Sequence, residues 1–174
     1  MSIYTLSEAS LETNLYLGER NIYGSSRLGT EVVHKVIASS DPGNITMTSD
    51  TNRFVGDKLY EISNHLGNVL EVITDRKLAI QDGIGGLDYY SPDVVSYSDY
   101  YPGGMLLPGR HANSSEYRFG YQGSEMDNEI KGEGNVYSTF YRLYDSRTLR
   151  WFSVDPVIHP YESPYVAMAN NPTI

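Results

Sequence analysis

The sequence has 174 residues, which is enough for one ordinary domain with a modest core or for a section of a larger protein. Its formal net charge of −9 argues against nucleic acid and anionic membrane surfaces as partners, because both are bound by clustered lysines and arginines. No run of about 18 apolar residues predicts membrane insertion, and the absence of cysteine excludes disulfides and thiolate chemistry.

Tyrosine dominates the apolar part of the composition. The chain contains 16 tyrosines, which raise its aromatic share to 12%. A tyrosine ring packs well on a pleated surface while its hydroxyl stays hydrated, so this enrichment favours strands over helices. We therefore expect an all-β fold.

The first third of the chain predicts strands separated by polar turns. Residues Leu11–Gly24 alternate loosely and predict a strand pair, with a turn at Tyr23–Ser26. Glu31–Ile37 is rich in β-branched residues and predicts a strand. Ser39–Asn52 collects small and polar residues and predicts a loop.

The clearest local signal is a β-hairpin at Lys58–Asp75. Two segments of high strand propensity flank Asn64–Asn68, and Gly67 supplies the positive φ that such a turn needs. Gln81–Leu87 holds three glycines and predicts a break, before a tyrosine-rich strand at Asp88–Tyr101 that Pro92 interrupts.

The second half alternates predicted loops and strands. Pro102–Ser115 predicts a loop, and period-two aromatics at Tyr117, Phe119 and Tyr121 predict a strand from Glu116 to Gly123. Val136–Tyr144 and Leu149–Val154 predict a second hairpin around Asp145–Thr148. The tail carries four of the eight prolines, so it allows only a short helical turn, at Tyr165–Ala169.

Two segments repeat one theme, which is an aromatic strand, a turn with Asp or Asn, and a return strand. Tyr60–Val69 and Tyr141–Arg150 both resemble the YD repeat, Tyr-x-x-(Tyr)-Asp-x-x-Gly-Arg/Asn. A hairpin of this kind cannot bury its own face and must stack on neighbours.

Five motifs occur in the order found in the RHS repeat-associated core domain, and the chain resembles the form of that family common among Bacteroidetes-like sequences. The resemblance covers roughly residues 15–174. Its motifs are Tyr23–Gly29, Ser63–Val69, Asp99–Pro102, Asp127–Glu129 and Arg150–Pro156.

The resemblance implies a ribbon of antiparallel hairpins wound into part of a curved or spiral shell wall. We expect residues 1–154 to form the β-repeat segment and residues 155–174 an irregular C-terminal plug. In toxins of this family the shell encloses a C-terminal effector, so the implied partners are the effector and the rest of the shell. Exposed strand edges would also allow self-association.

The resemblance also implies a place for the protein in the cell. Full-length bacterial members are exported or displayed at the cell surface. Residues Met1–Ser10 lack the pattern of a signal peptide, so the chain itself leaves the compartment open.

An alternative function is an extracellular module whose tyrosine-rich surface binds glycans or proteins.

Bacterial members of the family release the effector with an aspartyl autoprotease, and two residues match parts of its site. Asp155 matches the first catalytic Asp, and Arg142 matches a supporting Arg. An aspartyl mechanism needs two carboxylates that share one proton. The second Asp would lie beyond Ile174 in an Asp-Pro-x-Gly-type motif, so we expect no self-cleavage by this chain alone.

Both residues also have simpler interpretations. Asp155 precedes a proline and can cap a turn or a helix. Arg142 can pair across strands with Asp145 or Glu133, which is worth a fraction of a kcal/mol on an exposed face.

Two positions depart from the family pattern. Leu149 stands where the family usually has Gly, and Gly103-Gly104 replaces the usual Phe-Gly. A leucine at a position that prefers positive φ costs about 1 kcal/mol or more, so we expect a distorted hairpin there.

No metal or cofactor is expected. Leu78 and Ile80 occupy positions where a calcium loop between Asp75 and Asp88 would need carboxylates. The four histidines have no paired spacing and no cysteine to assist them, which argues against zinc.

Overall fold

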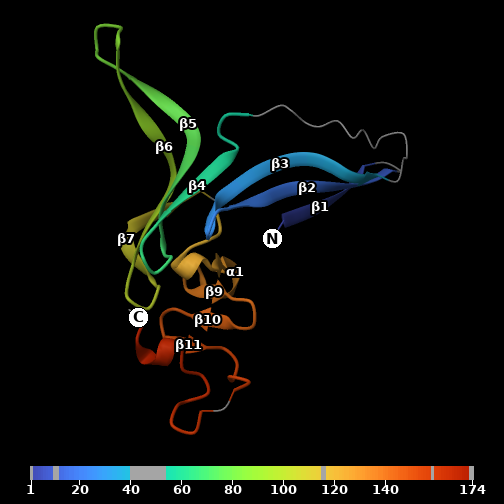
Figure 1. The fold of residues 1–174 in the computed structure, drawn as a ribbon, viewed down its shortest axis with the longest axis vertical. Coiled ribbons are helices and arrows are strands. Elements are labelled where there is room, and N and C mark those ends of the chain that lie inside the picture. The colour runs from blue at the N-terminus through green and yellow to red at the C-terminus, as the bar shows by residue number, and fades with distance from the viewer. Residues whose placement is uncertain (1, 10–11, 40–53, 115–116, 158, 173–174) are drawn as a thin grey trace. The chain divides into compact units, whose positions relative to one another are not determined.

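The computed structural model describes residues 2–9, 12–39, 54–114, 117–157 and 159–172 (Figure 1). Of the predicted Ser39–Asn52 loop only Ser39 is among them, and it ends a strand. Its regular structure is mostly antiparallel β-sheet, which confirms the all-β prediction. The chain divides into two compact units, Met1–Glu61 with Ile73–Asp93, and Ile62–Val72 with Val94–Ile174. The predicted boundary after residue 154 stays a prediction.

The larger sheet has seven strands that follow one another in chain order, β1 to β7. Each pairs with its neighbour, so β1 and β7 are the two ends of the series. The strands are β1 (Ser2–Ala9), β2 (Glu12–Tyr23), β3 (Arg27–Ser39), β4 (Lys58–Ser63), β5 (Val69–Gln81), β6 (Leu87–Tyr100) and β7 (Leu106–Asn113).

A smaller sheet belongs to the second unit and has the order β11-β10-β9-β8. Its strands are β8 (Glu125–Met126), β9 (Val136–Ser138), β10 (Leu143–Asp145) and β11 (Arg150–Trp151). Short helical segments accompany it, namely η2 (Tyr121–Gly123), α1 (Asn128–Lys131) and η3 (Met168–Asn170).

The predicted hairpin around Asn64–Asn68 is confirmed. The Asn64 amide donates to the Asn68 carbonyl, and the Asn64 side-chain oxygen accepts from the amides of Leu66 and Asn68, each at 3.0 Å. Gly67 has a φ of +80°. The turn at Tyr23–Ser26, the break at Gln81–Leu87 and the hairpin around Asp145–Thr148 are confirmed as well.

Several element boundaries were wrong. Leu11–Gly24 contains one strand and not a pair, because Gly18 sits at a register shift in β2 and not at a turn. The predicted Val136–Tyr144 strand is divided into β9 and β10 by a turn at Thr139–Arg142.

The loop predicted for Pro102–Ser115 is also wrong, because β7 occupies Leu106–Asn113. Pairing with β6 overrides the turn signal of Pro108 and Gly109, which are accommodated at a register shift. The strand predicted from Glu116 to Gly123 is replaced, among the described residues, by one bridge at Phe119 and the turn η2. There Tyr117 and Tyr121 are both buried.

The first unit is fixed around the start of β3 by an ion pair and a small buried group. Arg27 Nε lies 2.6 Å from Glu61 Oε1, and both side chains are largely buried. Thr30 and Leu59, which face each other in the β3–β4 register, are buried beside them. This contact joins the tip of the β2–β3 hairpin to β4.

The core of the second unit is built from tyrosines. Tyr121, Tyr137 and Tyr144 are almost fully buried with Ala167, and Tyr100 and Trp151 pack against them. Ring centroids of Tyr121 lie 5.9 Å from Tyr137 and 6.3 Å from Tyr144. A core of this composition must supply a partner for every buried hydroxyl.

One turn supplies most of those partners. Tyr121, Tyr144 and Tyr137 donate their hydroxyls to the consecutive carbonyls of Pro102, Gly103 and Gly104, at 2.9, 2.8 and 2.9 Å. Burial raises the pKa of each of these three tyrosines, so they remain protonated donors. The turn between β6 and β7 is thus bonded into the tyrosine core.

The glycines of this turn are required by its surroundings. Gly104 has a φ of +87°, and a Cβ there would lie 2.5 Å from the Tyr121 ring. A Cβ at Gly103 would lie 2.8 Å from the Leu149 side chain. Leu149 itself has a φ of +54°, so the expected strained position is confirmed. Gly103 and Leu149, where the sequence differs from the pattern that it resembles, are therefore close neighbours.

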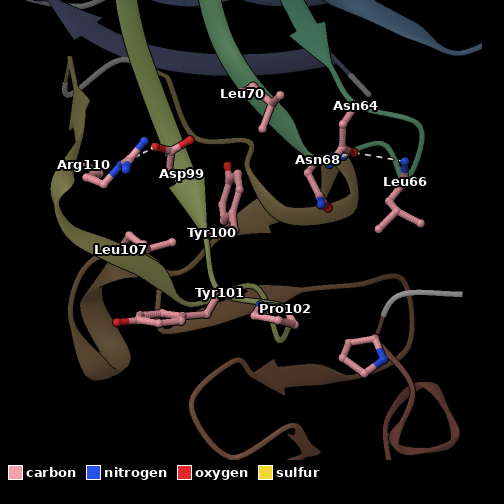
Figure 2. A pocket seen from close by; sticks show the side chains of 11 residues that line it. Asn64, Leu66, Asn68, Leu70, Asp99, Tyr100, Tyr101, Pro102, Leu107 and Arg110 are labelled. Atoms are coloured by element: carbon pink, nitrogen blue, oxygen red, sulfur yellow. Dashed lines mark hydrogen bonds and ion pairs between the residues drawn. The ribbon is translucent and has the colours of Figure 1, made fainter.

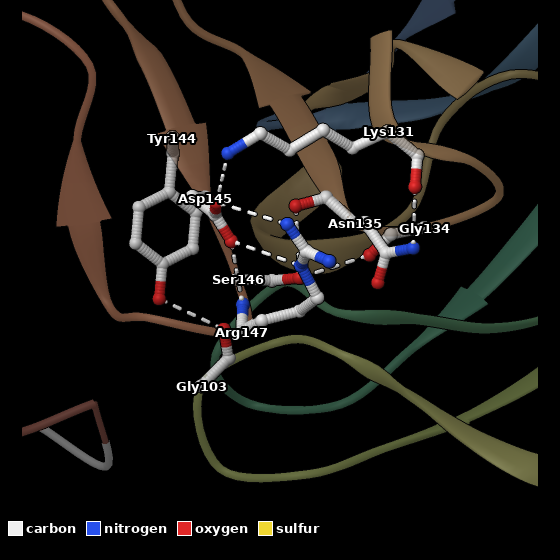
Figure 3. Close-up of polar contacts among 8 residues, drawn as sticks. All are labelled: Gly103, Lys131, Gly134, Asn135, Tyr144, Asp145, Ser146 and Arg147. Atoms are coloured by element: carbon white, nitrogen blue, oxygen red, sulfur yellow. Dashed lines mark hydrogen bonds and ion pairs between the residues drawn. The ribbon is translucent and has the colours of Figure 1, made fainter. Parts of the chain in front are cut away.

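Asp145, the Asp of the second YD-like segment, is the centre of a polar network (Figure 3). Lys131 Nζ lies 2.6 Å from Oδ2, and the Arg147 amide donates to Oδ1 at 3.0 Å. Burial alone would raise the pKa of Asp145, but the hydrogen bonds from Lys131 and Arg147 outweigh it and lower the pKa. Tyr144 and Asp145 thus fix opposite sides of one hairpin.

We predict that Gly104→Ala destabilises the second unit by about 3 kcal/mol, because it adds a ring clash to the strain of a positive φ. Gly109→Ala is the matched control. Gly109 has a φ of +71° but open space around its Cβ, so it should lose only about 1 kcal/mol. Urea unfolding followed by the fluorescence of the single tryptophan, Trp151, measures both. Equal losses would contradict the clash.

We further predict that Asp145→Asn lowers the free energy of unfolding at pH 7 by about 2 kcal/mol, because it removes charge-assisted hydrogen bonds. The folded-state pKa is depressed, so the contribution is complete above the ordinary pKa of 3.8 and is lost as pH falls through the folded value. Unfolding curves of the two proteins should converge in acid. A constant gap from pH 7 to pH 2 would refute this linkage.

Candidate functional site

The two residues singled out by the resemblance lie together in the second unit. Arg142 Nη2 is 2.8 Å from Asp155 Oδ2, and the two side chains are 16% and 29% exposed. Arg142 precedes β10 and Asp155 follows β11, and the pairing of Tyr144 with Trp151 in this hairpin brings the two residues close together. Of the two alternative partners predicted for Arg142, Asp145 and Glu133, Asp145 is bonded to Lys131 and Arg147 instead.

A hydrogen-bonded turn and the ring of Trp151 fix the position of Arg142. Thr139 closes the turn through its hydroxyl, which donates to the Arg142 carbonyl at 2.7 Å, and through its amide at 3.1 Å. The guanidinium carbon of Arg142 lies 4.3 Å from the Trp151 ring centroid. A planar guanidinium stacked in this way is preoriented toward a carboxylate.

Asp155 is positioned by the backbone as well as by Arg142. Its Oδ1 accepts from the Val157 amide at 2.9 Å, and its own amide donates to the Pro164 carbonyl at 2.8 Å. The Val157 hydrogen bond, and then the charges of Arg142 and His159, lower the pKa of Asp155. The predicted turn role of Asp155 is therefore present together with the ion pair.

A pocket of about 220 Å³ opens beside this pair. Besides Arg142, Trp151 and Asp155, it is lined by His159 and Glu162, which carry no motif that would single them out in the sequence. Arg142 Nη1 is buried and has no hydrogen-bond partner among the described residues. The Nη1 amino group of the guanidinium therefore makes no hydrogen bond within the described residues.

The chemistry of the pair follows from these contacts. An ionised carboxylate beside a guanidinium can accept a proton, but aspartyl catalysis needs a second carboxyl that carries one. Within the described part of the chain, no cluster of three or more histidine, aspartate or glutamate side chains is placed to hold a metal. The described residues also include no helix long and apolar enough to cross a membrane.

The sequence was compared with protein families and with known proteins. No protein-family profile matches it. The chain is 30% identical over 128 residues to salivary gland surface protein 1 of Aedes aegypti, a match that covers 71% of this chain and 4% of that protein.

Two crystal structures of TcdB2-TccC3, an RHS-repeat toxin complex, are similar to the chain. The form without its hypervariable C-terminal region matches 99% of this chain with a TM-score of 0.51, and the TEV form matches 97% with a TM-score of 0.50. Both are 17% identical, and this chain spans 8% of either one. The likeness establishes an RHS-like fold.

We predict that nuclear magnetic resonance titration of the side-chain carboxyl will give Asp155 a pKa below the ordinary 3.8. Arg142→Gln should raise that pKa only in part, because the Val157 hydrogen bond persists. Arg147→Gln is the control, since Arg147 contacts Asp145. An unchanged Asp155 pKa in Arg142→Gln would contradict the ion pair.

Proposed function

We propose that this chain forms a section of the wall of an RHS-type shell that encloses a C-terminal effector. The observation that carries the proposal is the match of 99% of the chain to TcdB2-TccC3. The sequential order of all seven strands in the larger sheet agrees with it, because a ribbon of hairpins extends by adding one strand after another.

The surface of the chain supports contacts with further strands. β1 and β7 end the larger sheet, and an unpaired strand edge exposes backbone groups that a neighbouring strand can satisfy. On β6 the rings of Tyr89, Tyr90 and Tyr97 are about half exposed. Rings of this size are usually covered in an assembled protein, so the rest of the shell is the proposed partner.

The experiment is electron cryo-microscopy and limited proteolysis of the natural polypeptide that carries this chain. We expect a hollow β-shell and an effector that resists protease until the shell is unfolded. The isolated chain should elute as more than a monomer in light scattering, because its edges and tyrosines lack their cover. A solid particle with a protease-sensitive effector would overturn the proposal.

A second candidate function is a share in an aspartyl site that releases the effector. The observation that favours it is the 2.8 Å ion pair between Arg142 and Asp155, two residues that line the same pocket. In this role Asp155 would be one of the two carboxyls, Arg142 would orient it, and the second carboxyl would come from elsewhere in the protein.

The effect of Asp155→Asn in the natural polypeptide tests this role. We expect the uncut protein to persist on a gel, since an amide cannot accept the proton. Asp99→Asn is the matched control, because Asp99 also pairs with an arginine but is 47% exposed and far along the chain. Cleavage of Asp155→Asn at the wild-type rate would exclude Asp155 from the reaction.

A further inference from the structure

The C-terminal tail contains a left-handed backbone turn that the proposed function does not use. Met168, Ala169 and Asn170 have φ values of +50°, +48° and +58°, so three successive residues other than glycine share this conformation. Such residues normally adopt it singly, because the Cβ lies too close to the following carbonyl oxygen. Backbone strain of this kind persists only where the surrounding contacts enforce it, and it occurs mainly at functional sites and switch regions.

Two backbone hydrogen bonds close the turn. The Asn170 amide donates to the Ala167 carbonyl at 3.0 Å, and the Asn171 amide donates to the Met168 carbonyl at 2.7 Å. Ala167 is 1% exposed and belongs to the tyrosine core, whereas Ala169 and Asn170 are exposed. The core therefore fixes the residue from which the turn begins.

The Met168 thioether joins this turn to the turn η2. Its Sδ accepts from the Tyr121 hydroxyl at 3.6 Å and from the Gln122 side-chain amide at 3.5 Å. Gln122 also has a positive φ, +50°, and its backbone amide donates to Asn68 Oδ1 at 2.9 Å. One sulfur atom thus connects two strained turns.

The Met168 side chain is accessible to a small oxidant. It is partly exposed, and it lines the pocket of about 220 Å³ that also contains Arg142 and Asp155. Hydrogen peroxide oxidises an accessible thioether to the sulfoxide. A sulfur lone pair attacks one peroxide oxygen, the O–O bond breaks, and the second oxygen leaves as water with both protons.

The sulfoxide does not fit the place of the thioether. Both donors are within hydrogen-bond distance of the sulfur, so an oxygen added toward either one would lie too close to it. The thioether also packs against the tyrosine core, where a sulfoxide would be polar. We propose that Met168 is a redox switch, and that its oxidation to the sulfoxide opens the Met168–Asn170 turn.

Opening of the turn changes the walls of two pockets. Met168 and Ala169 line the pocket of the Arg142–Asp155 pair. Beyond the turn, the Pro172 carbonyl accepts from the Tyr121 hydroxyl at 3.3 Å, and Pro172 lines a second pocket of about 410 Å³. Figure 2 shows this second pocket, whose lining also includes Asn68, Tyr100 and Pro102. The inference requires neither a shell nor a cutting site.

Hydrogen exchange of the 174-residue chain before and after treatment with hydrogen peroxide tests the proposal. We expect mass spectrometry to find the sulfoxide at Met168, and the peptide that carries the Asn170 and Asn171 amides to exchange about ten-fold faster afterwards. Methionine sulfoxide reductase with dithiothreitol should restore the slow exchange. The Asp82 amide, which donates to the Gly86 carbonyl in the first unit, is the internal reference.

Met168→Leu and Met126→Leu form a matched pair of variants. Both methionines are partly buried and pack against the tyrosine core, and leucine nearly conserves their volume, so both variants should fold. Peroxide should leave the exchange of the turn unchanged in Met168→Leu. In Met126→Leu it should speed the exchange as in the wild type.

Three results would overturn the proposal. They are a Met168 that stays reduced while Met126 is oxidised, an oxidised Met168 with unchanged exchange of the turn, and equal acceleration by peroxide in Met168→Leu and the wild type. The shell and release experiments use no oxidant, so their failure is distinguishable from the failure of this switch.

Discussion

The hydrogen bonds from three tyrosine hydroxyls to three consecutive carbonyls hold the second unit together. Tyr121, Tyr137 and Tyr144 come from segments far from the β6–β7 turn in sequence, yet all donate to Pro102–Gly104. A buried phenol without a partner would cost about 1–3 kcal/mol, so the turn and the rings must form as one structure. The high tyrosine content is thereby a requirement of the core and not only of a surface.

The same turn lies against Leu149, a leucine with a positive φ in the next hairpin. A glycine at 103 leaves room for the Leu149 side chain, because a Cβ at 103 would lie 2.8 Å from it. Leucine at a φ of +54° stores strain, but its contact with Gly103 returns packing that a glycine pair would lack.

The sequence predicted correctly those elements whose conformation is set by their own residues, and it failed where pairing or burial sets the conformation. The Asn64–Asn68 turn was foreseen because its asparagine and glycine encode it alone. The strand β7 was missed because Pro108 and Gly109 read as loop, whereas pairing with β6 decides the outcome. Likewise the spacing of Tyr117 and Tyr121 fits the two-residue period of a strand. Both rings are buried in the structure, and the chain forms the helical turn η2 at Tyr121 instead. At the candidate site, the resemblance singled out Arg142 and Asp155, whose role stays a prediction, whereas no pattern pointed to Glu162 and His159 in the same pocket.

The position of the Arg142–Asp155 pair depends on the tyrosine core through one residue. Trp151 packs against Tyr144, with ring centroids 5.5 Å apart, and it also contacts the Arg142 guanidinium. Tyr144 is in turn anchored to Gly103. A change in the Pro102–Gly104 turn would therefore move the surface on which Arg142 rests, although no atom of that turn lines the pocket. The preorganisation of Arg142 toward Asp155 is in this sense supplied by the β6–β7 turn, and the geometry of the pair should follow the integrity of that turn.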